Sequence, residues 1–406
     1  MRNSVVLPPP LGPSSAVTVP AAADQPALEA ALAHAGAHGH DLYIPAGVYR
    51  VSPPLLVPSG VRVFGDGART ILRAAGSSMP IVTANGGNIS SVIGGIGVEY
   101  VTISDLTIDL ATNGTLSNGI AFIPGDAYEG TPCADIRVER VRVIGRPQHQ
   151  YLIWSFRTER VTVADSYVDG GCVDFDTFED QNGIEIVGGT GTTVRGNHVR
   201  RCANFGIGAV AIYGYTAGTD GAIIESNHIT ACGTGVSLGT SLRGSTPQNL
   251  RNVAVRGNMI RGSHRVGVDV WTPSAGTSMR NVSVTGNTID GGPVAVYVHG
   301  HASDTGHRNV VVSGNICDGQ TTTSGADGAI AVTAFHGATL QGNTISDAAG
   351  AAVRVSFADD VTVAGNTVTR SQSNGVAGAV AKRLAVIGNR FTECGIGATE
   401  STADNT

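Results

Sequence analysis

An asparagine that returns every 23 to 31 residues constrains this chain more than any other feature of its sequence. From residue 190 onward the phrases VRGNHV, IESNHI, VRGNMI, VTGNTI, VSGNIC, LQGNTI, VAGNTV and VIGNRF follow one another. Their asparagines are Asn197, Asn227, Asn258, Asn287, Asn315, Asn343, Asn366 and Asn389. A period of this length is typical of supersecondary units stacked into a solenoid.

Each repeat reads as two short alternating strands around a Gly-Asn or Ser-Asn corner, followed by a loop and a third strand. Third strands are predicted at 183–187 (GIEIV), 235–239 (GVSLG), 267–271 (GVDVW) and 294–298 (VAVYV). Asparagine suits the corner because it tolerates left-handed backbone and its amide can bond the asparagine of the next coil. Coils about 4.8 Å apart would align equivalent side chains in columns, inside and outside the solenoid.

Composition agrees with a chain of many short strands rather than several globular domains. Glycine numbers 56 of the 406 residues, whereas aromatic residues make up 5% and charged residues 14%. Weaker copies of the pattern stand upstream at 101–110, 136–145 and 161–170. The sequence therefore predicts an all-β fold, a right-handed parallel β-helix solenoid of about ten or eleven coils.

A segment of another kind precedes the repeats. Residues 1–23, rich in proline, alanine and serine, are expected to form a flexible arm. Residues 24–40 predict a helix with Asp24 as its N-cap and Gly36 near its end, which would cap the apolar end of the solenoid. The β-helix is expected over 41–401, with a short tail at 402–406.

Charge and hydropathy restrict the partners. The net charge of −6 and the isoelectric point near 6.0 argue against a nucleic-acid partner, which requires a basic surface. No apolar run approaches the length of a membrane span, and MRNSVVLPPPLGPSS lacks the apolar core of a signal peptide. An extracellular or virion-associated location is nevertheless favoured.

Cys172, Cys202 and Cys232 recur at intervals of 30 and predict a column of buried thiols rather than a metal site.

The opening of the repetitive region resembles that of the pectate-lyase-like superfamily. After the helix come PAGVY at 45–49, PSGV at 58–61 and GDG at 65–67. With the coils, the resemblance covers nearly the whole chain, and it implies a polysaccharide or oligosaccharide partner and, from kinship, a homotrimer. It does not specify the reaction, because the superfamily includes polysaccharide lyases, glycoside hydrolases, uronate epimerases and phage tailspikes. The Y-G-x-D-P-H motif of mannuronan epimerases and the N-T-D, D-D and G-H-G series of polygalacturonases are absent.

An acidic loop is the strongest catalytic signal. Its carboxylates, with the one on the adjoining strand, are Asp174, Asp176, Glu179, Asp180 and Glu185. In GIEIV the isoleucines point inward, so Glu185 is expected to face outward, into a groove walled by the loops at 173–183, 239–248, 272–280 and 300–308. Glycoside hydrolysis uses two carboxyl groups about 5 to 9.5 Å apart, and crowding raises the pKa of one of them. A solvated loop and a Ca²⁺ site are the alternatives.

Other outward residues are candidates for substrate binding. By the same alternation they are Asp269, Trp271, Tyr297 and His299, with Tyr213 and Arg265 in addition. Aromatic rings can stack on sugars, and Arg265 could pair with an acidic sugar or be an ordinary surface arginine. Asp269 is expected three coils, about 14 Å, from Glu185, which is too far for a direct acid pair. The spacing of His299, His301 and His307 matches no zinc pattern, so no metal site is expected there.

Three functions follow in order of preference. A glycoside hydrolase that needs no cofactor comes first, because of the acidic loop. A polysaccharide lyase or uronate epimerase comes second, since such enzymes employ Lys, Arg, His or Tyr and the sole lysine, Lys382, lies in a late coil. A non-catalytic, tailspike-like glycan-binding module comes third.

Overall fold

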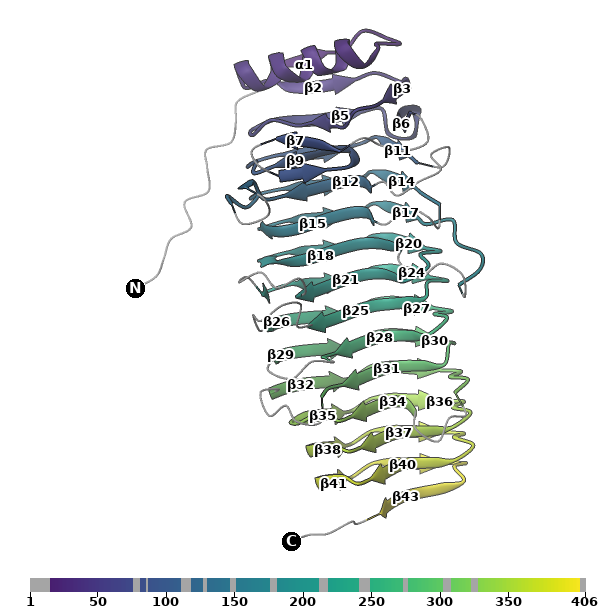
Figure 1. Ribbon diagram of the computed structural model, residues 1–406. Coiled ribbons are helices and arrows are strands. Elements are labelled where there is room, and N and C mark those ends of the chain that lie inside the picture. The colour runs from purple at the N-terminus through teal and green to yellow at the C-terminus, as the bar shows by residue number, and fades with distance from the viewer. Residues whose placement is uncertain are drawn as a thin grey trace.

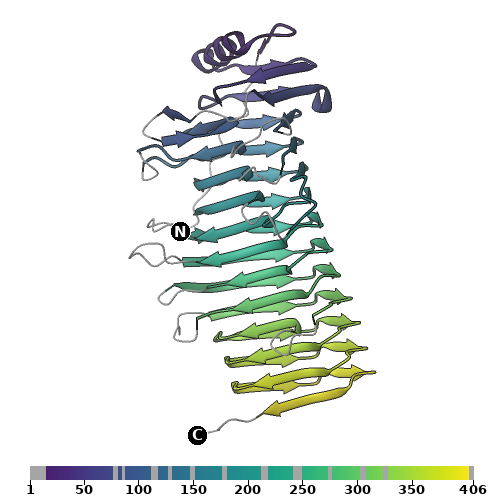
Figure 2. The ribbon, with the colours of Figure 1, turned by 45° about the vertical axis from the view of Figure 1, so that its right-hand side comes forward.

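The computed structural model describes residues 15–75, 81–84, 87–110, 118–126, 130–146, 151–175, 181–211, 218–240, 249–272, 277–301, 308–322 and 328–401. These residues form one long stack of coils, with a helix at the N-terminal end (Figure 1). Each coil contributes three strands, and strands of successive coils pair in parallel. The turned view in Figure 2 shows the same stacking from another side. The predicted parallel β-helix is therefore confirmed.

The strands fall into three groups by their place in the coil. The first group is β2 (Asp41–Ile44), β5 (Arg62–Gly65), β10 (Thr102–Ser104), β13 (Arg137–Glu139), β16 (Thr162–Ala164), β19 (Thr193–Arg195), β23 (Ile223–Glu225), β26 (Asn249–Arg256), β29 (Ser278–Thr285), β32 (Arg308–Ser313), β35 (Ala338–Gln341), β38 (Asp359–Ala364) and β41 (Lys382–Ile387). The second group is β3 (Gly47–Val51), β6 (Thr70–Ala74), β11 (Thr107–Asp109), β14 (Arg142–Ile144), β17 (Tyr167–Asp169), β20 (His198–Arg200), β24 (His228–Thr230), β27 (Met259–Arg261), β30 (Thr288–Asp290), β33 (Ile316–Asp318), β36 (Thr344–Ser346), β39 (Thr367–Thr369) and β42 (Arg390–Thr392).

The third group carries the candidate site. It is β4 (Leu55–Leu56), β9 (Ser91–Ile96), β12 (Asn118–Ile123), β15 (Tyr151–Glu159), β18 (Asn182–Thr190), β21 (Phe205–Ala211), β25 (Thr234–Thr240), β28 (Val266–Trp271), β31 (Val294–His299), β34 (Gly328–Thr333), β37 (Ala351–Ser356), β40 (Asn374–Ala379) and β43 (Ile396–Ser401). Outside the groups lie β1 (Ala16–Thr18), β22 (Thr219–Asp220), the hairpin of β7 (Val82–Ala84) and β8 (Gly87–Ile89), and a short 3-10 helix, η1 (Gly67–Arg69). The first and third groups, with β1 and β22, form one sheet of 28 strands.

The number of coils exceeds the expectation. The second group forms a sheet of 13 strands with one strand from each coil, so the solenoid has thirteen coils rather than ten or eleven. The two coils beyond the expected eleven are those of β3 and β6, and in the early coils the corner is not an asparagine. In the coil that precedes Asn197, Ser166 holds that position, and its backbone N–H donates to Asn197 Oδ1 at 3.0 Å.

A column of aliphatic residues fills the interior, as the alternation predicted. Ile184, Ile207, Val236, Val268 and Val296 occupy equivalent positions in successive third strands, and each is 0% exposed. They belong to a single apolar core that extends from Val19 to Val376. The burial of such columns is the main source of stability in a solenoid.

The asparagine ladder is confirmed. The backbone N–H and Nδ2 of Asn258 both donate to Oδ1 of Asn287, at 3.0 and 2.9 Å, and Nδ2 also donates to the Ile224 carbonyl of the preceding coil at 2.9 Å. The amide link repeats from Asn197 to Asn389. The left-handed residue, however, is the one before the asparagine, as at Gly257 with φ 61° and Ser226 with φ 54°. In each Gly-Asn pair, therefore, the glycine adopts the left-handed backbone of the turn and the asparagine hydrogen-bonds to the neighbouring coils.

The thiols at intervals of 30 are buried and reduced. Cys172, Cys202 and Cys232 are each at most 1% exposed, and all three are free. Contact with Cys232 and burial raise the pKa of the Cys202 thiol. The predicted column of buried thiols is confirmed.

Helix α1 (Gln25–His38) lies across the N-terminal end of the solenoid (Figure 1). Leu28, Leu32 and Ala35 are its buried residues. The helix ends at Gly39, which has φ 67°, rather than near Gly36. Gly36 instead allows the helix to pack closely against Pro58, because a Cβ at this position would lie 2.7 Å from the Pro58 ring.

Two further observations concern the ends of the chain. Residues 16–18, within the stretch expected to be a flexible arm, form β1, which pairs with β2. The tail at 402–406 lies outside the described residues. In the part of the chain that the structure describes, no helix has the length and hydropathy needed to cross a membrane.

The N-cap gives a first prediction. Asp24 accepts a hydrogen bond from the Ala27 N–H at 3.1 Å. Asp24→Ala should lower the free energy of unfolding by about 1 kcal/mol, because one N–H of the first helical turn loses its acceptor. Chemical denaturation would measure the loss, and Asp24→Ser, which keeps an oxygen acceptor, should restore most of it. Equal stability of wild type and Asp24→Ala would contradict the capping role.

Candidate functional site

The outward face of the third strands carries two columns of side chains that strand pairing aligns. One column runs Ala121, Trp154, Glu185, Gly208, Ser237, Asp269, Tyr297, Ala331 and Arg354. The other, two residues further along each strand, runs Ile123, Phe156, Val187, Val210, Gly239, Trp271, His299, Thr333 and Ser356. This face changes character along the solenoid, from apolar in the early coils to polar from β25 onward.

The early part of this face is covered. Ile123, Phe156, Val187 and Val210 form a second apolar cluster outside the solenoid interior, and each is at most 3% exposed. Leu56, Val82, Trp154 and Trp271 are partly buried and pack against it. Polar chemistry accessible to a ligand is therefore confined to the later coils of this face.

Glu185 points away from the core, as the alternation predicted, but it does not face an open groove. Glu185 is 2% exposed. Trp154 precedes it in the column and stacks on Tyr151, with ring centroids 5.0 Å apart. Gly208 follows it, and the Phe205 ring occupies the space that a side chain at Gly208 would fill. The expectation of an exposed carboxylate is wrong because large aromatic side chains of the adjoining coils enclose it.

Burial raises the pKa of Glu185 to about 8, although a hydrogen bond from Asn182 Nδ2 to Oε2, 3.1 Å long, acts in the opposite direction. At neutral pH the group is therefore a carboxylic acid with a proton to donate. Asn182 Oδ1 is buried and accepts no hydrogen bond from the described residues. A neutral Glu185 supplies the missing donor, which would make a two-bond pair between acid and amide.

Of the remaining members of the acidic loop, Asp174 belongs to the described part of the chain. Asp174 lies in an exposed turn, where its backbone carbonyl accepts a hydrogen bond from the Cys172 thiol at 3.3 Å. The next residue, Phe175, stacks on His264 at 5.1 Å, three coils further along. Asp176, Glu179 and Asp180 lie outside the described residues. In the two outward columns from β12 to β37, the other described carboxylate is Asp269, three coils from Glu185.

Asp269, Tyr297 and His299 form the best-organised polar cluster on this face. His299 Nε2 lies 2.9 Å from Asp269 Oδ1, across adjacent coils. The rings of Tyr297 and His299 stack with centroids 4.3 Å apart. The side chains of His299 and Asp269 are 32% and 21% exposed, so the cluster is accessible from solvent. In the tautomer in which Nε2 donates to Asp269, a neutral imidazole has its lone pair on Nδ1.

Trp271 lies beside this cluster and close to the sheet. Its Nε1 donates to Ser237 Oγ at 2.9 Å. The indole lies over Gly239, where a Cβ would come within 2.2 Å of the ring. The position thus presents a partly exposed flat ring next to His299, which is its partner in the following coil.

Arg265 and Tyr213 do not extend the cluster. Arg265 Nη2 donates to the carbonyl oxygens of Ala203 and Asn204 and to the side-chain oxygen of Asn204, at 3.2, 2.9 and 3.0 Å. This arginine therefore ties together the ends of coils, and the hypothesis that it binds an acidic sugar is not supported. Tyr213 lies outside the described residues. The described residues contain no group of three or more His, Cys, Asp or Glu side chains able to hold a metal ion.

Sequence reasoning missed Asn182, Ser237 and Arg354. Arg354 is the clearest omission, because AAVRVS at 351–356 carries the same alternation as GVDVW and places the arginine outward. Asn182 and Ser237 gave no separate signal, since their importance comes from contacts with Glu185 and Trp271 in space.

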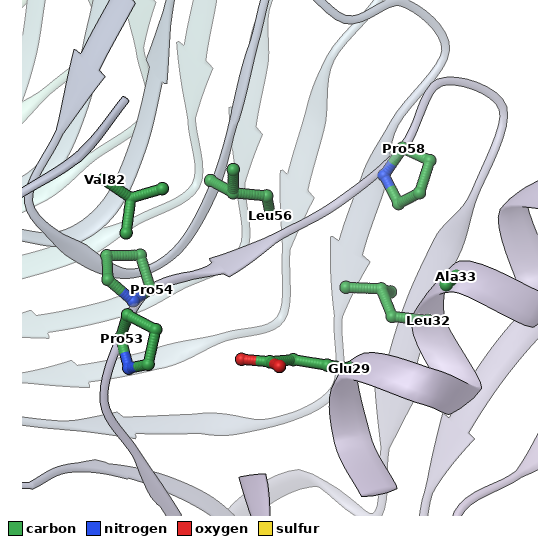
Figure 3. Close-up of a pocket in the computed structure, with 8 residues that line it drawn as sticks. All are labelled: Glu29, Leu32, Ala33, Pro53, Pro54, Leu56, Pro58 and Val82. Carbon is green, nitrogen blue, oxygen red and sulfur yellow. The ribbon is translucent and has the colours of Figure 1, made fainter. Parts of the chain in front are cut away.

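A pocket at the N-terminal end adjoins the first strand of the third group, far along the solenoid from Asp269 and His299 (Figure 3). It lies between α1 and the segment 53–58, and it is mainly apolar. Its lining residues are Glu29, Leu32, Ala33, Pro53, Pro54, Leu56, Pro58 and Val82. One carboxylate among prolines and aliphatic side chains offers no pair of groups for acid and base catalysis.

Two family models match the chain. The model described as "Rhamnogalacturonase A/epimerase, pectate lyase-like" matches residues 20–257. The model described as "Periplasmic copper-binding protein (NosD)" matches residues 240–406. Comparison with curated proteins found no match.

Solved structures with the same fold differ widely in what their names state. The A-module of a mannuronan C-5 epimerase from Azotobacter vinelandii is 18% identical, with 94% of this chain and 93% of that chain covered and a TM-score of 0.58. An endo-xylogalacturonan hydrolase from Aspergillus tubingensis is 13% identical, with 96% and 100% covered and a TM-score of 0.58. The surface adhesin PfbA of Streptococcus pneumoniae is 13% identical, with 95% and 99% covered and a TM-score of 0.57. At these identities the similarity shows the fold.

Proposed function

The chain belongs to the rhamnogalacturonase A/epimerase, pectate lyase-like family, and from this premise we propose that it acts on a polysaccharide bound along the outward face of its third strands. The pre-formed pair of Asp269 and His299 beside Tyr297 carries this proposal. The names of similar structures, which include an epimerase and a hydrolase of polysaccharides, support the substrate class. They do not decide the reaction, which rests on the side chains of this chain.

The cluster fits proton abstraction from a uronate sugar better than hydrolysis. His299 is oriented by Asp269 and can remove the proton from the carbon next to the carboxylate. In a lyase, the electron pair left on that carbon forms a double bond as the neighbouring C–O bond breaks, and the Tyr297 hydroxyl gives its proton to the departing oxygen. In an epimerase, the C–O bond stays intact and the carbon takes a proton on its opposite face. Glycoside hydrolysis would need a second carboxylate near Asp269, and the described outward positions place Glu185 about 14 Å away.

Hydrolysis with Glu185 as general acid is the second candidate. The observation that favours it is the neutral state of this buried carboxyl at pH 7, a property that a general acid requires. The second carboxylate would come from the acidic loop around Asp174. In this alternative a substrate would have to displace the aromatic cover of Glu185, formed by Trp154 and the Phe205 ring.

A panel of polyuronates and neutral glycans separates these chemistries. A lyase produces an unsaturated sugar that absorbs ultraviolet light, whereas a hydrolase produces reducing ends without that absorbance. An epimerase changes the proton NMR spectrum of the polymer without shortening the chain. Absence of all three changes on the whole panel would leave a glycan-binding module, the third expectation from the sequence.

His299→Gln should lower kcat/KM by about 100-fold or more, because glutamine cannot take up the proton. Tyr297→Phe should lower kcat without loss of folding, since the ring and its stacking on His299 remain. A matched control is His336→Gln, which removes another aspartate-paired histidine, 3.8 Å from Asp359 and away from the third strands. Initial rates on the active polyuronate would measure each effect. Full activity of His299→Gln would exclude proton abstraction at this cluster.

A further inference from the structure

Arg354 stands on the same outward face, two coils beyond Tyr297, and it differs from most arginines of this solenoid. Strand pairing places Tyr297 opposite Ala331, and Ala331 opposite Arg354. Its backbone is therefore two strand spacings, about 10 Å, from that of Tyr297 along the solenoid axis. Arg354 Nε donates to Ser356 Oγ at 3.0 Å. The structure thus fixes the direction of this side chain and leaves its two terminal nitrogens for another acceptor.

Several arginines of the solenoid pair with acids of the neighbouring coil. Arg140, Arg160, Arg370 and Arg383 each contact an aspartate at 2.5 to 2.8 Å. For Arg354 the partner found among the described residues is a hydroxyl. A partly buried guanidinium without a carboxylate is costly unless it binds an anion, so this position differs in kind from the arginine pairs that join coils.

The immediate surroundings of Arg354 suit an anionic ligand. The residues before and after it in the column are Ala331 and Ala377, which contribute neither an acid nor a bulky side chain. In the adjacent column stand the hydroxyls of Thr333 and Ser356. Thr333 Oγ1 is buried and has no hydrogen-bond partner in the part of the chain that the structure describes. One guanidinium with flanking hydroxyls, on a face otherwise poor in positive charge, matches the acceptor geometry of a carboxylate or sulfate group.

We propose that Arg354 forms an anion-binding subsite, two coils from the reacting sugar, which recognises a carboxylate or sulfate on a distal unit of the bound glycan. This inference rests on the proposed function only in that it assumes a glycan bound along this face. The backbone of Arg354 lies two strand spacings, about 10 Å, from that of Tyr297, a separation that another unit of an extended glycan can span. Arg354 is therefore a specificity residue, and the substrate carries negative charge on more than the unit that reacts.

Direct binding tests the subsite without reference to turnover. Isothermal titration would use oligogalacturonate and oligomannuronate as carboxylate probes, a sulfated oligosaccharide as the sulfate probe, and a cello-oligosaccharide of equal length as the neutral probe. Arg354→Gln should weaken the binding of the matching anionic probe by about 10- to 100-fold and leave the neutral probe unchanged. Arg354→Lys should restore part of the affinity, because it keeps the charge and loses the bidentate geometry. The probe that loses affinity identifies the anion.

Arg280→Gln is the matched control, because Arg280 is an exposed arginine on β29 in the first group of strands. It should leave every affinity unchanged. An equal loss for neutral and anionic probes, or no loss in Arg354→Gln, would overturn the subsite. On a substrate that is turned over, Arg354→Gln should raise KM and leave kcat near the wild-type value, whereas a fall in kcat alone would also overturn it.

The two proposals fail in different ways. Anionic probes that bind through Arg354 but are not altered by the enzyme would retain the subsite and reject the chemistry at His299. Turnover that depends on His299 and not on Arg354 would retain the chemistry and reject the subsite. If no anionic probe binds the wild-type protein, both are rejected.

Discussion

Asn287→Ala should lower the free energy of unfolding by about 3 to 5 kcal/mol. The side chain of Asn287 donates to Asn315 Oδ1 and to the Val255 carbonyl, at 2.9 and 3.0 Å. Its Oδ1 accepts from the backbone N–H and Nδ2 of Asn258, at 3.0 and 2.9 Å. The substitution therefore removes the acceptor of two buried donors, the backbone N–H and Nδ2 of Asn258. It also removes one donor from each of two acceptors, Asn315 Oδ1 and the Val255 carbonyl. Desolvated polar groups without partners cost about 1 to 3 kcal/mol each.

Asn281→Gly is the control for this experiment. Asn281 lies in the same coil, has φ 54°, and links Asn252 and Asn309 through an exposed amide ladder. Glycine keeps the left-handed backbone, and water replaces the lost hydrogen bonds, so the expected loss is below about 1 kcal/mol. Chemical denaturation followed by circular dichroism would compare the variants, with hydrogen exchange at the three coils as a local probe, because solenoids need not unfold in two states. A similar loss of stability in both variants would show that the buried ladder of Asn287 is no more stabilising than the exposed ladder of Asn281.

Glu185→Gln should remove a pH dependence of stability that the wild-type protein shows between about pH 4.5 and pH 8. Burial raises the pKa of this carboxyl from its ordinary 4.5 to about 8, so within that window the folded protein holds a proton that the unfolded chain has released. The contribution of Glu185 to stability is then fully present below pH 4.5 and falls as the pH rises through the window, by roughly 1 kcal/mol for each pH unit. Glutamine mimics the neutral acid and keeps an amide group for Asn182. The variant should therefore be the more stable protein at pH 8.

The pH experiment has its own control and a spectroscopic check. Glu225→Gln removes the carboxylate of Glu225 on β23, which pairs with Arg256. This variant should leave the slope of stability against pH unchanged between pH 4.5 and pH 8. Infrared spectra at pH 7 should contain the C=O stretch of a buried protonated carboxyl in the wild type and lack it in Glu185→Gln. A wild-type slope that persists in Glu185→Gln would assign the proton to another group. If hydrolysis is found, loss of turnover in Glu185→Gln at unchanged stability would support Glu185 as its general acid.

Some features of the candidate site could be read from the sequence and others could not. Alternation placed Glu185, Asp269, Trp271, Tyr297 and His299 outside the solenoid interior, and the strand pairing agrees. Alternation says nothing about what covers an outward residue. Glu185 is buried by side chains of the neighbouring coils, so its raised pKa and its pairing with Asn182 required the structure.

The contact between Asp269 and His299 is another feature that the alternation of the strands could not predict. Strand register sets Asp269 opposite Tyr297, and Trp271 opposite His299. The hydrogen bond crosses this register diagonally, because the tyrosine ring stacks on the imidazole and directs it toward the carboxylate. Arg265 shows the reverse case, in which a side chain expected at the face bonds backbone carbonyls of an earlier coil.

The sequence by itself determined the solenoid, its asparagine ladder, its thiol column and its N-terminal capping helix, since each follows from a short pattern that recurs at a nearly constant interval. Only the tertiary structure decided the number of coils, the residue that turns each corner, the burial of Glu185 and the partners of Asp269, Arg265 and Arg354. The physical reason is that the periodic pattern specifies which face of a strand each side chain occupies. Exposure, protonation and pairing depend instead on the size and direction of side chains that are about 30 residues away in the chain and one coil away in space.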